Sequence, residues 1–326
     1  MEPATVEVIR GDRVESLHRV HAVVHDGASA VEAWGDPARV TFPRSSCKMM
    51  QALPLVESGA ADAAGLTDAH LALACASHQG DAVHTEAVAA WLAAEGLSAD
   101  DLRCGAHEPY GTAARDALIR SGEAPCQIHN NCSGKHAGFL TLNRRLGGGA
   151  EYVEVDHPVQ RAVRAAFEEV CGEESAGWGI DGCSAPNFAV SLDGFARGLA
   201  RFARAGTDRR GAAMRRLRGA MAGHPVMVAG EGRACTALMR AMDGVAVKTG
   251  AEAVFAAILP DANGGRGLGI AVKVEDGATR AAEAVIAALL VRHGALDPAH
   301  PEAQRLREGP IANRRGIVTG GYRVLL

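Results

Sequence analysis

The sequence predicts an α/β fold in which strands from both ends of the chain share one antiparallel sheet, with helices between them along the chain. Near the N-terminus, residues 6–24 alternate apolar and polar side chains around Gly11 and Asp12, as in a β-hairpin. Most of the central segment has helical spacing. Strand-like apolar runs return near the C-terminus at 245–247, 254–259 and 268–274, the last two separated by a Gly-rich turn at 263–267.

The elements follow in order along the chain. A strand is expected within 31–40, and a helix from Ser45 to about Ala61 that Pro54 should kink. Thr67 is a suitable N-cap for a helix over 68–75, and residues 97–110 and 178–187 look like loops, the second with strand character. The polar stretch 127–138 opens into a helix at Phe139. Further helices are expected up to 92, over 157–171, up to 205, and over 208–222, 233–241 and 279–293.

The length and the charge balance limit the function classes. We expect one domain over residues 1–326, in which a helical subregion of about 45–240 is inserted between terminal strands of one sheet. The formal net charge of −4 gives no general attraction for nucleic acid or anionic lipid. The apolar stretch 281–291 is too short to span a membrane and contains Glu283. The N-terminal residues do not form a signal peptide, so we expect a cytoplasmic protein with reduced cysteines or metal-binding thiolates.

Two short motifs suggest an activated serine. Ser45 and Lys48 are three residues apart, so they can meet on one side of a helical turn, where a lysine can take the proton of a serine nucleophile. Lys248-Thr249-Gly250 follows an apolar run, and such a triplet beside an SxxK helix is typical of serine enzymes that recognise penicillin. A helix cap with a solvated lysine is the alternative interpretation of the first motif.

Cys132 and Cys183 lie in separate Gly-rich polar segments, and two thiolates alone do not complete a zinc site. His136 and Asp181 are nearby candidates for further ligands. Spacing alone favours buried free thiols. Ser77, next to His78, reads as part of a polar loop, because side chains adjacent in sequence need not face each other.

Together these segments resemble the serine-dependent L-asparaginase II family of the rhizobial type. The matching segments run in family order over nearly the whole chain: PRSSCK at 43–48, QALP at 51–54, SGAA at 58–61, CASHQG at 75–80, NCSGKHAG at 131–138, HPVQ at 157–160, IDGCSAP at 180–186, KTGAE at 248–252 and GIAVKVEDG at 269–277. The combination of CSGKH with IDGC is far more specific than SxxK or KTG. Ser184 and Ala253 depart from the pattern, since glycine is expected at both positions.

The resemblance implies a fold similar to serine β-lactamases and serine glutaminases, and an enzyme that hydrolyses L-asparagine to L-aspartate and ammonia through an acyl-enzyme. It implies Ser45 as nucleophile with Lys48 as its base, and a second pair of Ser77 with Lys248, for which Lys273 is an alternative. It implies zinc held by Cys132, Lys135 and Cys183, with substrate contacts or ligand support from Arg44, His136 and Asp181. A homodimer is also expected.

A lysine base must be neutral to accept a proton, so an alkaline pH optimum is expected. Two other functions compete with this interpretation. The same chemistry fits glutamine, because one methylene changes binding by only about 1–3 kcal/mol. A non-catalytic protein that binds zinc or an amino acid is the second alternative, against which the intact set of serines and lysines argues.

Overall fold

The computed structural model describes residues 1–260 and 267–326. Within these residues the main sheet has eight strands, all antiparallel, in the order β11-β12-β1-β2-β10-β9-β8, with β3 paired to β2. Its strands are β1 (Ala4–Arg10), β2 (Arg13–His25), β3 (Ala30–Trp34), β8 (Ala246–Gly250), β9 (Val254–Leu259), β10 (Leu268–Val274), β11 (Ile311–Ala312) and β12 (Val318–Leu325). Two short ribbons pair β4 (Val40–Thr41) with β7 (Val190–Ser191), and β5 (Trp178–Ile180) with β6 (Pro186–Phe188).

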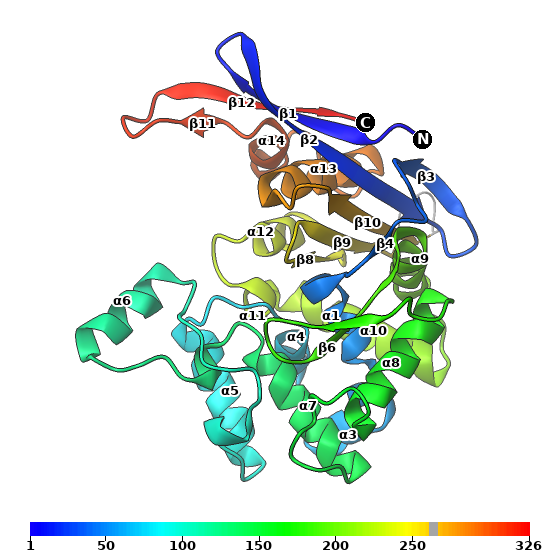
Figure 1. Ribbon diagram of the computed structural model, residues 1–326, viewed down its shortest axis with the longest axis vertical. Coiled ribbons are helices and arrows are strands. Elements are labelled where there is room, and N and C mark those ends of the chain that lie inside the picture. Colours follow the sequence, from blue (N-terminus) through cyan, green and yellow to red (C-terminus); the bar gives the residue numbers. More distant parts are fainter. Residues whose placement is uncertain (261–266) are drawn as a thin grey trace.

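The helices of the described residues gather mainly in the half of the molecule away from β11 and β12 (Figure 1). They are α1 (Lys48–Gln51), α2 (Leu53–Glu57), α3 (Ala60–Ala63), α4 (Asp68–Ala74), α5 (Ala82–Ala94), α6 (Thr112–Ser121), α7 (Ser133–Leu146), α8 (Pro158–Cys171), α9 (Leu192–Ala203), α10 (Arg209–Gly223), α11 (Pro225–Ala229), α12 (Ala234–Ala241), α13 (Thr279–Arg292) and α14 (Pro301–Glu308). Short 3₁₀ turns are η1 (Arg44–Cys47), η2 (Ala99–Asp101) and η3 (Gln127–His129). No helix among them is long and apolar enough to cross a membrane.

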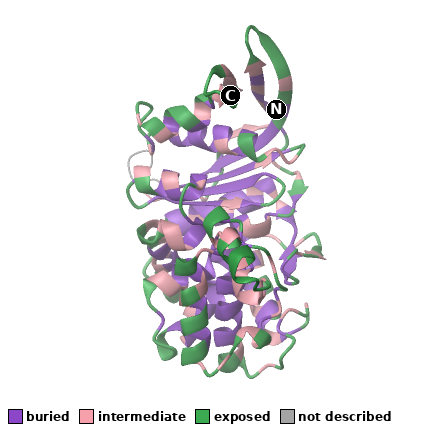
Figure 2. Cartoon of the chain, turned by 90° about the vertical axis from the view of Figure 1, so that its left-hand side faces the viewer, coloured by how far each residue is buried: buried purple, intermediate pink, exposed green. Residues whose placement is uncertain are grey.

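The central strands are covered on both faces. Every residue of β9 is buried, and β10 is buried except at Lys273, which requires a layer above and below because side chains alternate between faces. Helices α9 and α13 both pack against β9 and β10. A Cβ at Gly269 would lie 2.2 Å from the backbone nitrogen of Ala200, so this glycine permits the close approach of α9. In Figure 2 the buried layer runs through the sheet, while the tip of the β1–β2 hairpin is exposed.

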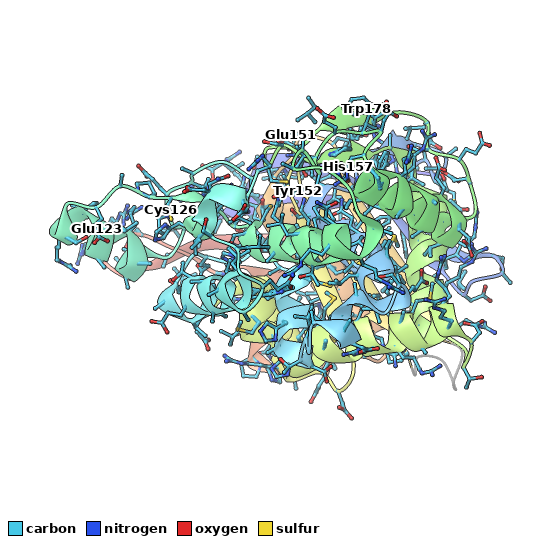
Figure 3. All side chains as sticks on the ribbon, turned by 90° about the horizontal axis from the view of Figure 1, so that it is seen from below. Glu123, Cys126, Glu151, Tyr152, His157 and Trp178 are labelled. Atoms are coloured by element: carbon cyan, nitrogen blue, oxygen red, sulfur yellow. The ribbon has the colours of Figure 1, made fainter. Side chains whose placement is uncertain are left out.

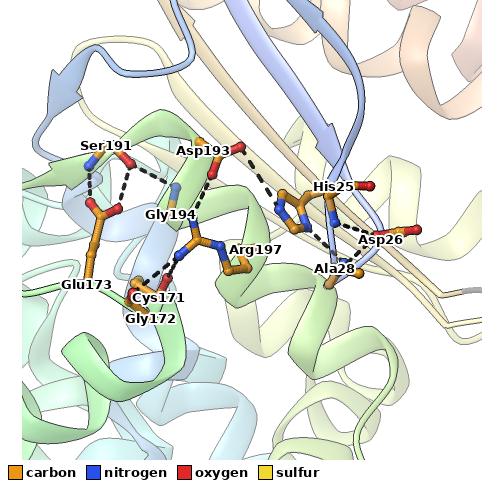
Figure 4. Close-up of polar contacts among 12 residues, drawn as sticks. His25, Asp26, Ala28, Cys171, Gly172, Glu173, Ser191, Asp193, Gly194 and Arg197 are labelled. Carbon is orange, nitrogen blue, oxygen red and sulfur yellow. Dashed lines mark hydrogen bonds and ion pairs between the residues drawn. The ribbon is translucent and has the colours of Figure 1, made fainter.

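Polar contacts fix α9 to its neighbours (Figure 4). Arg197 donates to the carbonyl oxygen of Cys171, at the end of α8, over 2.8 Å and to Asp193 over 2.6 Å. Asp193 in turn lies 4.0 Å from the His25 ring on β2. Because the last carbonyls of a helix lack partners within it, the arginine satisfies the end of α8 and ties α8 to α9.

The predicted α/β class is confirmed: strands from both chain ends share one antiparallel sheet, with the helical segment between them in sequence. The hairpin, the C-terminal strands and the helices at 68–75, 157–171, 208–222, 233–241 and 279–293 are found within a few residues of the predicted bounds. The turn at 263–267 falls largely outside the described residues.

Several predicted elements were wrong in detail. The helix from Ser45 to Ala61 is four short pieces, because Pro54 starts a helix rather than bending one and Gly59 adopts a left-handed φ of 78°. The segment 31–40 divides between β3 and β4. Helix α7 starts at Ser133, six residues before Phe139, so the polar CSGKHAG motif forms its N-terminal turns. Helices α6, α11 and α14 and strands β11 and β12 were not predicted.

Candidate active site

Ser45 lies in the one-turn helix η1, which packs against strands β8 and β9. The preceding residue, Arg44, has a left-handed φ of 53°, which a non-glycine residue adopts only at a cost. On β8, a Cβ at Gly250 would lie 2.7 Å from the carbonyl oxygen of Pro43 and 3.0 Å from the Ser46 nitrogen. The glycine of the KTG triplet is therefore required for β8 to reach η1, and it places backbone groups of β8 beside Ser45.

Lys48 is 1% exposed, and its amine has three partners. Nζ donates to the carbonyl oxygen of Ala76, to Ser77 Oγ over 3.0 Å, and to Cys132 Sγ over 3.1 Å. Ser77 follows α4 and is held by its own N–H, which donates to the carbonyl oxygen of Val228 over 2.9 Å.

The serine–lysine contact seen here joins Ser77 to Lys48. Within the described residues, no hydrogen bond joins the Ser45 hydroxyl to Lys48 or joins Ser77 to Lys248. Hydrogen bonds of catalytic groups often form only once substrate is bound, so both Ser45 and Ser77 remain candidate nucleophiles.

Lys248 on β8 is fully buried, and its Nζ donates to the carbonyl oxygen of Thr249 over 2.7 Å. Burial lowers the pKa of Lys248 to about 7, and the nearby Lys48 acts in the same direction. Lys273, the alternative partner for Ser77, lies on β10 and donates to the carbonyl oxygens of Glu252 and Val274. Of these two lysines, Lys248 is thus the one whose surroundings favour a neutral amine near pH 7.

Two thiols and a lysine meet between α7 and the β5–β6 hairpin. Cys132 is the N-cap of α7, Lys135 lies in its first turn, and Cys183 lies in the hairpin turn. Lys135 Nζ donates to Cys183 Sγ over 3.0 Å. A hydrogen bond between the two thiols lowers the pKa of Cys183 and raises that of Cys132, and the Lys135 amine faces the sulfur of Cys183.

These three side chains fit a zinc ion. Thiolate sulfur and nitrogen are ligands that zinc prefers, and a bound dication would favour two thiolates and a neutral amine. In the part of the chain that the structure describes, no group of three or more His, Cys, Asp and Glu side chains is placed to hold a metal. Lys135, whose amine lies 3.0 Å from Cys183 Sγ, would be the third protein ligand of a metal held by the two thiols. A buried Nε2 of His136 without a hydrogen-bond partner lies next to this cluster.

His136 is fully buried in α7, and its Nδ1 lies 3.0 Å from the hydroxyl of Tyr152. Burial lowers the pKa of His136 to about 4, so its imidazole is neutral. Of the two roles expected for His136, support of the thiols matches this position better than contact with a substrate. Tyr152 was not among the predicted site residues, because no motif distinguishes it from a core aromatic. Figure 3 labels it in the segment between α7 and α8.

Arg44 and Asp181 form an ion pair at the site. Arg44 Nη2 and Nε donate to Asp181 Oδ1 over 2.7 and 3.1 Å, and both side chains are partly exposed. The same oxygen accepts the Gly182 N–H over 2.7 Å. The pair links the residue before Ser45 to the hairpin that carries Cys183.

A family model described as L-asparaginase II matches residues 6–324. The chain belongs to the L-asparaginase II family. Membership of this family supports an asparaginase-type amidohydrolase. The comparison with curated proteins gave no match.

Two solved structures are similar to this L-asparaginase II family member. One is a β-lactamase from Mycobacterium bovis, at 15% identity and TM-score 0.48, covering 84% of this chain and 94% of that one. The other is Mglu in its native form, at 13% identity and TM-score 0.44, covering 88% of this chain and 66% of that one. At these values neither likeness bears on the chemistry of this chain.

Backbone strain is concentrated around the site. Among the described residues, the non-glycine residues with positive φ are Arg44, Ser184, Glu252 and Ala253. All four lie in the segments that carry Ser45, Cys183 and Gly250. Ser184, at φ 70°, and Ala253, at φ 53°, are the two positions where the resemblance led us to expect glycine. Both departures thus place a side chain where a left-handed backbone favours glycine.

Proposed function

We propose that the protein hydrolyses L-asparagine to L-aspartate and ammonia through a β-aspartyl ester on Ser45. The observation that supports this proposal is the position of Ser45. It follows Arg44, whose φ is left-handed, it lies beside Gly250 of β8, and it precedes the buried Lys48 by one helical turn. A nucleophile on a sharp turn presents its hydroxyl to the substrate and keeps backbone N–H groups beside it.

The Arg44–Asp181 pair supplies a match for the amino-acid end of the substrate. The α-carboxylate would accept hydrogen bonds from Arg44, while the α-ammonium would donate to Asp181. Because the two charges lie side by side, the pair complements a zwitterion better than it complements a simple amide. This interaction would position the side-chain amide of asparagine near Ser45.

Lys48 would take the proton of Ser45 as its Oγ attacks the amide carbon. The N–H groups of Ser45 and Ala251 would stabilise the oxyanion that forms. Ser77, 3.0 Å from Lys48 Nζ, would pass that proton to the leaving nitrogen. Ammonia leaves, and water, activated in the same way, then hydrolyses the ester and restores Ser45.

Cys132, Lys135 and Cys183 would hold zinc, which would supply positive charge for binding polar substrate groups. Lys135 Nζ donates to Cys183 Sγ, and the Cys132 and Cys183 thiols interact, which supports a shared role of the three side chains in binding a cation. We assign no step of the hydrolysis to the metal.

Ammonia release tests the proposal. Wild-type protein and Ser45→Ala are compared with L-asparagine and with L-glutamine, and Ser121→Ala, at the exposed end of α6, serves as the matched control. We expect release from asparagine in the wild type and the control, and background rates in Ser45→Ala.

A faster reaction with glutamine would change the substrate and keep the mechanism. Activity that survives in Ser45→Ala would move the nucleophile to Ser77. Release from neither amide in folded, zinc-loaded protein would overturn the amidohydrolase assignment and favour a binding protein.

A further inference from the structure

The turn between β8 and β9 follows directly on the KTG triplet and has a strained backbone. Glu252 and Ala253 are consecutive residues with left-handed φ values of 57° and 53°. A residue with a side chain disfavours this conformation, because its Cβ comes too close to the following carbonyl oxygen. Such strain persists only where contacts from the surrounding structure hold it. The turn therefore needs support from another part of the fold.

That support comes from β10. The Nζ of Lys273 donates to the carbonyl oxygen of Glu252 and, over 2.9 Å, to that of Val274. The N–H of Val274 donates to the carbonyl oxygen of Ala253 over 3.2 Å. The carbonyls of both left-handed residues thus accept hydrogen bonds from one strand, and the partners of the Lys273 amine are backbone carbonyls rather than carboxylates.

The strand register places Lys273 on the face of the sheet against which the turn of Ser45 packs. Gly250 is paired with Val254 across β8 and β9, and Val254 is paired with Lys273 across β9 and β10. Residues directly opposite each other in antiparallel strands share a face. On that face η1 lies against Gly250, where a Cβ would be 3.0 Å from the Ser46 nitrogen. The lysine and η1 therefore lie on the same side of these strands.

Ala251 lies between two supported points of the backbone. Gly250 is in close contact with η1, and the Glu252 carbonyl is bonded by Lys273. Ala251 is exposed, and among the described residues its N–H has no hydrogen-bond acceptor. An N–H group that is unpaired and held in a fixed direction can stabilise an oxyanion without rearrangement.

We propose that Lys273 is a positioning residue: by bonding the Glu252 carbonyl, it holds the β8–β9 turn in its left-handed conformation and so directs the Ala251 N–H at the oxyanion. The side chains of Glu252 and Ala253 oppose this conformation, so the local preference of the turn does not maintain it. The inference rests on the proposed function, because it assigns the purpose of the turn to the hydrolysis.

The first test compares side chains at position 273 by steady-state release of ammonia from L-asparagine. Lys273→Met removes both hydrogen bonds of the amine, whereas Lys273→Arg keeps a cation that can donate to carbonyls. Arg204→Met is the matched control, because Arg204 donates to the carbonyl oxygen of Asp26, in the turn between β2 and β3, over 2.8 Å.

We expect kcat to fall by about 10–100-fold in Lys273→Met while KM stays nearly unchanged, because the Ala251 N–H contributes mainly in the transition state. Lys273→Arg should keep most of the wild-type kcat. Arg204→Met should match the wild type in both kcat and KM.

A second test concerns the strain itself. Glycine adopts a left-handed φ without steric cost, so Ala253→Gly lowers the strain of the turn. The fall in kcat caused by Lys273→Met should therefore be smaller in the Ala253→Gly background than in the wild type, by at least about twofold.

Hydrogen exchange examines the turn in the absence of substrate. In Lys273→Met the amides of residues 250–254 should exchange faster than in the wild type and in Arg204→Met, because the turn opens more often once its support is removed. Mass spectrometry of the peptide that contains these residues gives the rates.

An unchanged kcat in Lys273→Met would overturn the inference, and so would a raised KM with unchanged kcat, which would place the lysine in contact with the substrate. Equal losses in the two backgrounds would overturn the role of strain. If Lys273→Met does not fold, Lys273→Gln, whose amide nitrogen lies one bond closer to the backbone, carries the same expectations. Wild-type protein that releases ammonia from neither amide would overturn the proposed function, whereas unchanged hydrogen exchange in Lys273→Met would overturn the support of the turn independently of activity.

Discussion

Two regions of this molecule are equally buried and have opposite compositions. Where α13 packs on β9 and β10, the buried side chains are apolar, such as Phe255 and Leu289. Where η1, α7 and β8 meet, the buried side chains include Lys48, Lys135 and Lys248. Burying apolar surface stabilises a fold by about 25 cal/mol per Å². Burying a charge costs several kcal/mol unless its partners compensate.

The two regions also differ in backbone conformation. The strands of the apolar region have no positive-φ residue, whereas each of the four such non-glycine residues in the described chain lies near the polar region. Strain and buried charge in one place indicate that the rest of the fold holds this region in a conformation that local preferences oppose. The two regions should therefore respond to substitution in opposite ways.

The largest expected effect is on the rate after a change in the polar region. Ser45→Ala should lower the rate of ammonia release by at least about 10⁴-fold, since the nucleophile is removed. Its free energy of unfolding should stay close to that of the wild type, because the Ser45 hydroxyl makes no hydrogen bond among the described residues. Steady-state kinetics and urea denaturation of the same preparation check both statements.

A substitution in the apolar region should lower stability and leave the catalytic rate nearly unchanged. Leu289→Ala, in α13, should lower the free energy of unfolding by about 2–5 kcal/mol, the usual cost of removing a buried leucine side chain. The kcat of the molecules that remain folded should change little. A loss of kcat with unchanged stability would contradict the division of the molecule into these two regions.

Lys248→Met should make the protein more stable near neutral pH. The folded-state pKa of Lys248 is about 7, below its ordinary 10.5, so folding disfavours the bound proton. Stability of the wild type therefore rises as pH rises from about 7 to 10.5, and the penalty is full below pH 7. We expect the variant to gain on the order of 2–4 kcal/mol near neutral pH. The gain should vanish at high pH, as urea denaturation at several pH values would reveal.

The matched control is Lys273→Met, on β10, whose amine is partly exposed. Its gain in stability should be smaller. A Lys248→Met protein that is less stable than the wild type near neutral pH would show that the buried lysine supports the fold.

The smallest effect concerns backbone strain. Ser184→Gly should raise the free energy of unfolding by about 1 kcal/mol, because glycine adopts the φ of 70° without steric cost. Ser121→Gly, at the end of helix α6, should lower it by up to about 1 kcal/mol. Thermal unfolding of the two variants gives the comparison, and equal destabilisation by both would argue against strain at Ser184.

The contrast also explains what could be predicted from the sequence. The strand of β9 and the helix α13 follow from their apolar runs alone, because burial there sets both composition and period. The SxxK and KTG motifs and the family resemblance were enough to locate the polar region in the sequence. They identify which residues it contains but not which of them are in contact. That Lys48 binds Ser77 rather than Ser45 depends on how α4 ends beside η1, which no local pattern encodes. No sequence pattern predicts that the Tyr152 hydroxyl lies beside His136, because this contact depends on how distant segments of the chain pack together.

We expect Ser45, which follows the strained Arg44, to be the nucleophile and Ser77 to transfer protons. Acid quenching during turnover of L-asparagine, followed by peptide mapping with mass spectrometry, distinguishes the two serines. We predict an aspartyl ester on Ser45, absent from Ser45→Ala and present in Ser77→Ala, where slower proton transfer should prolong its life. An ester on Ser77, in the wild type or in Ser45→Ala, would contradict this account.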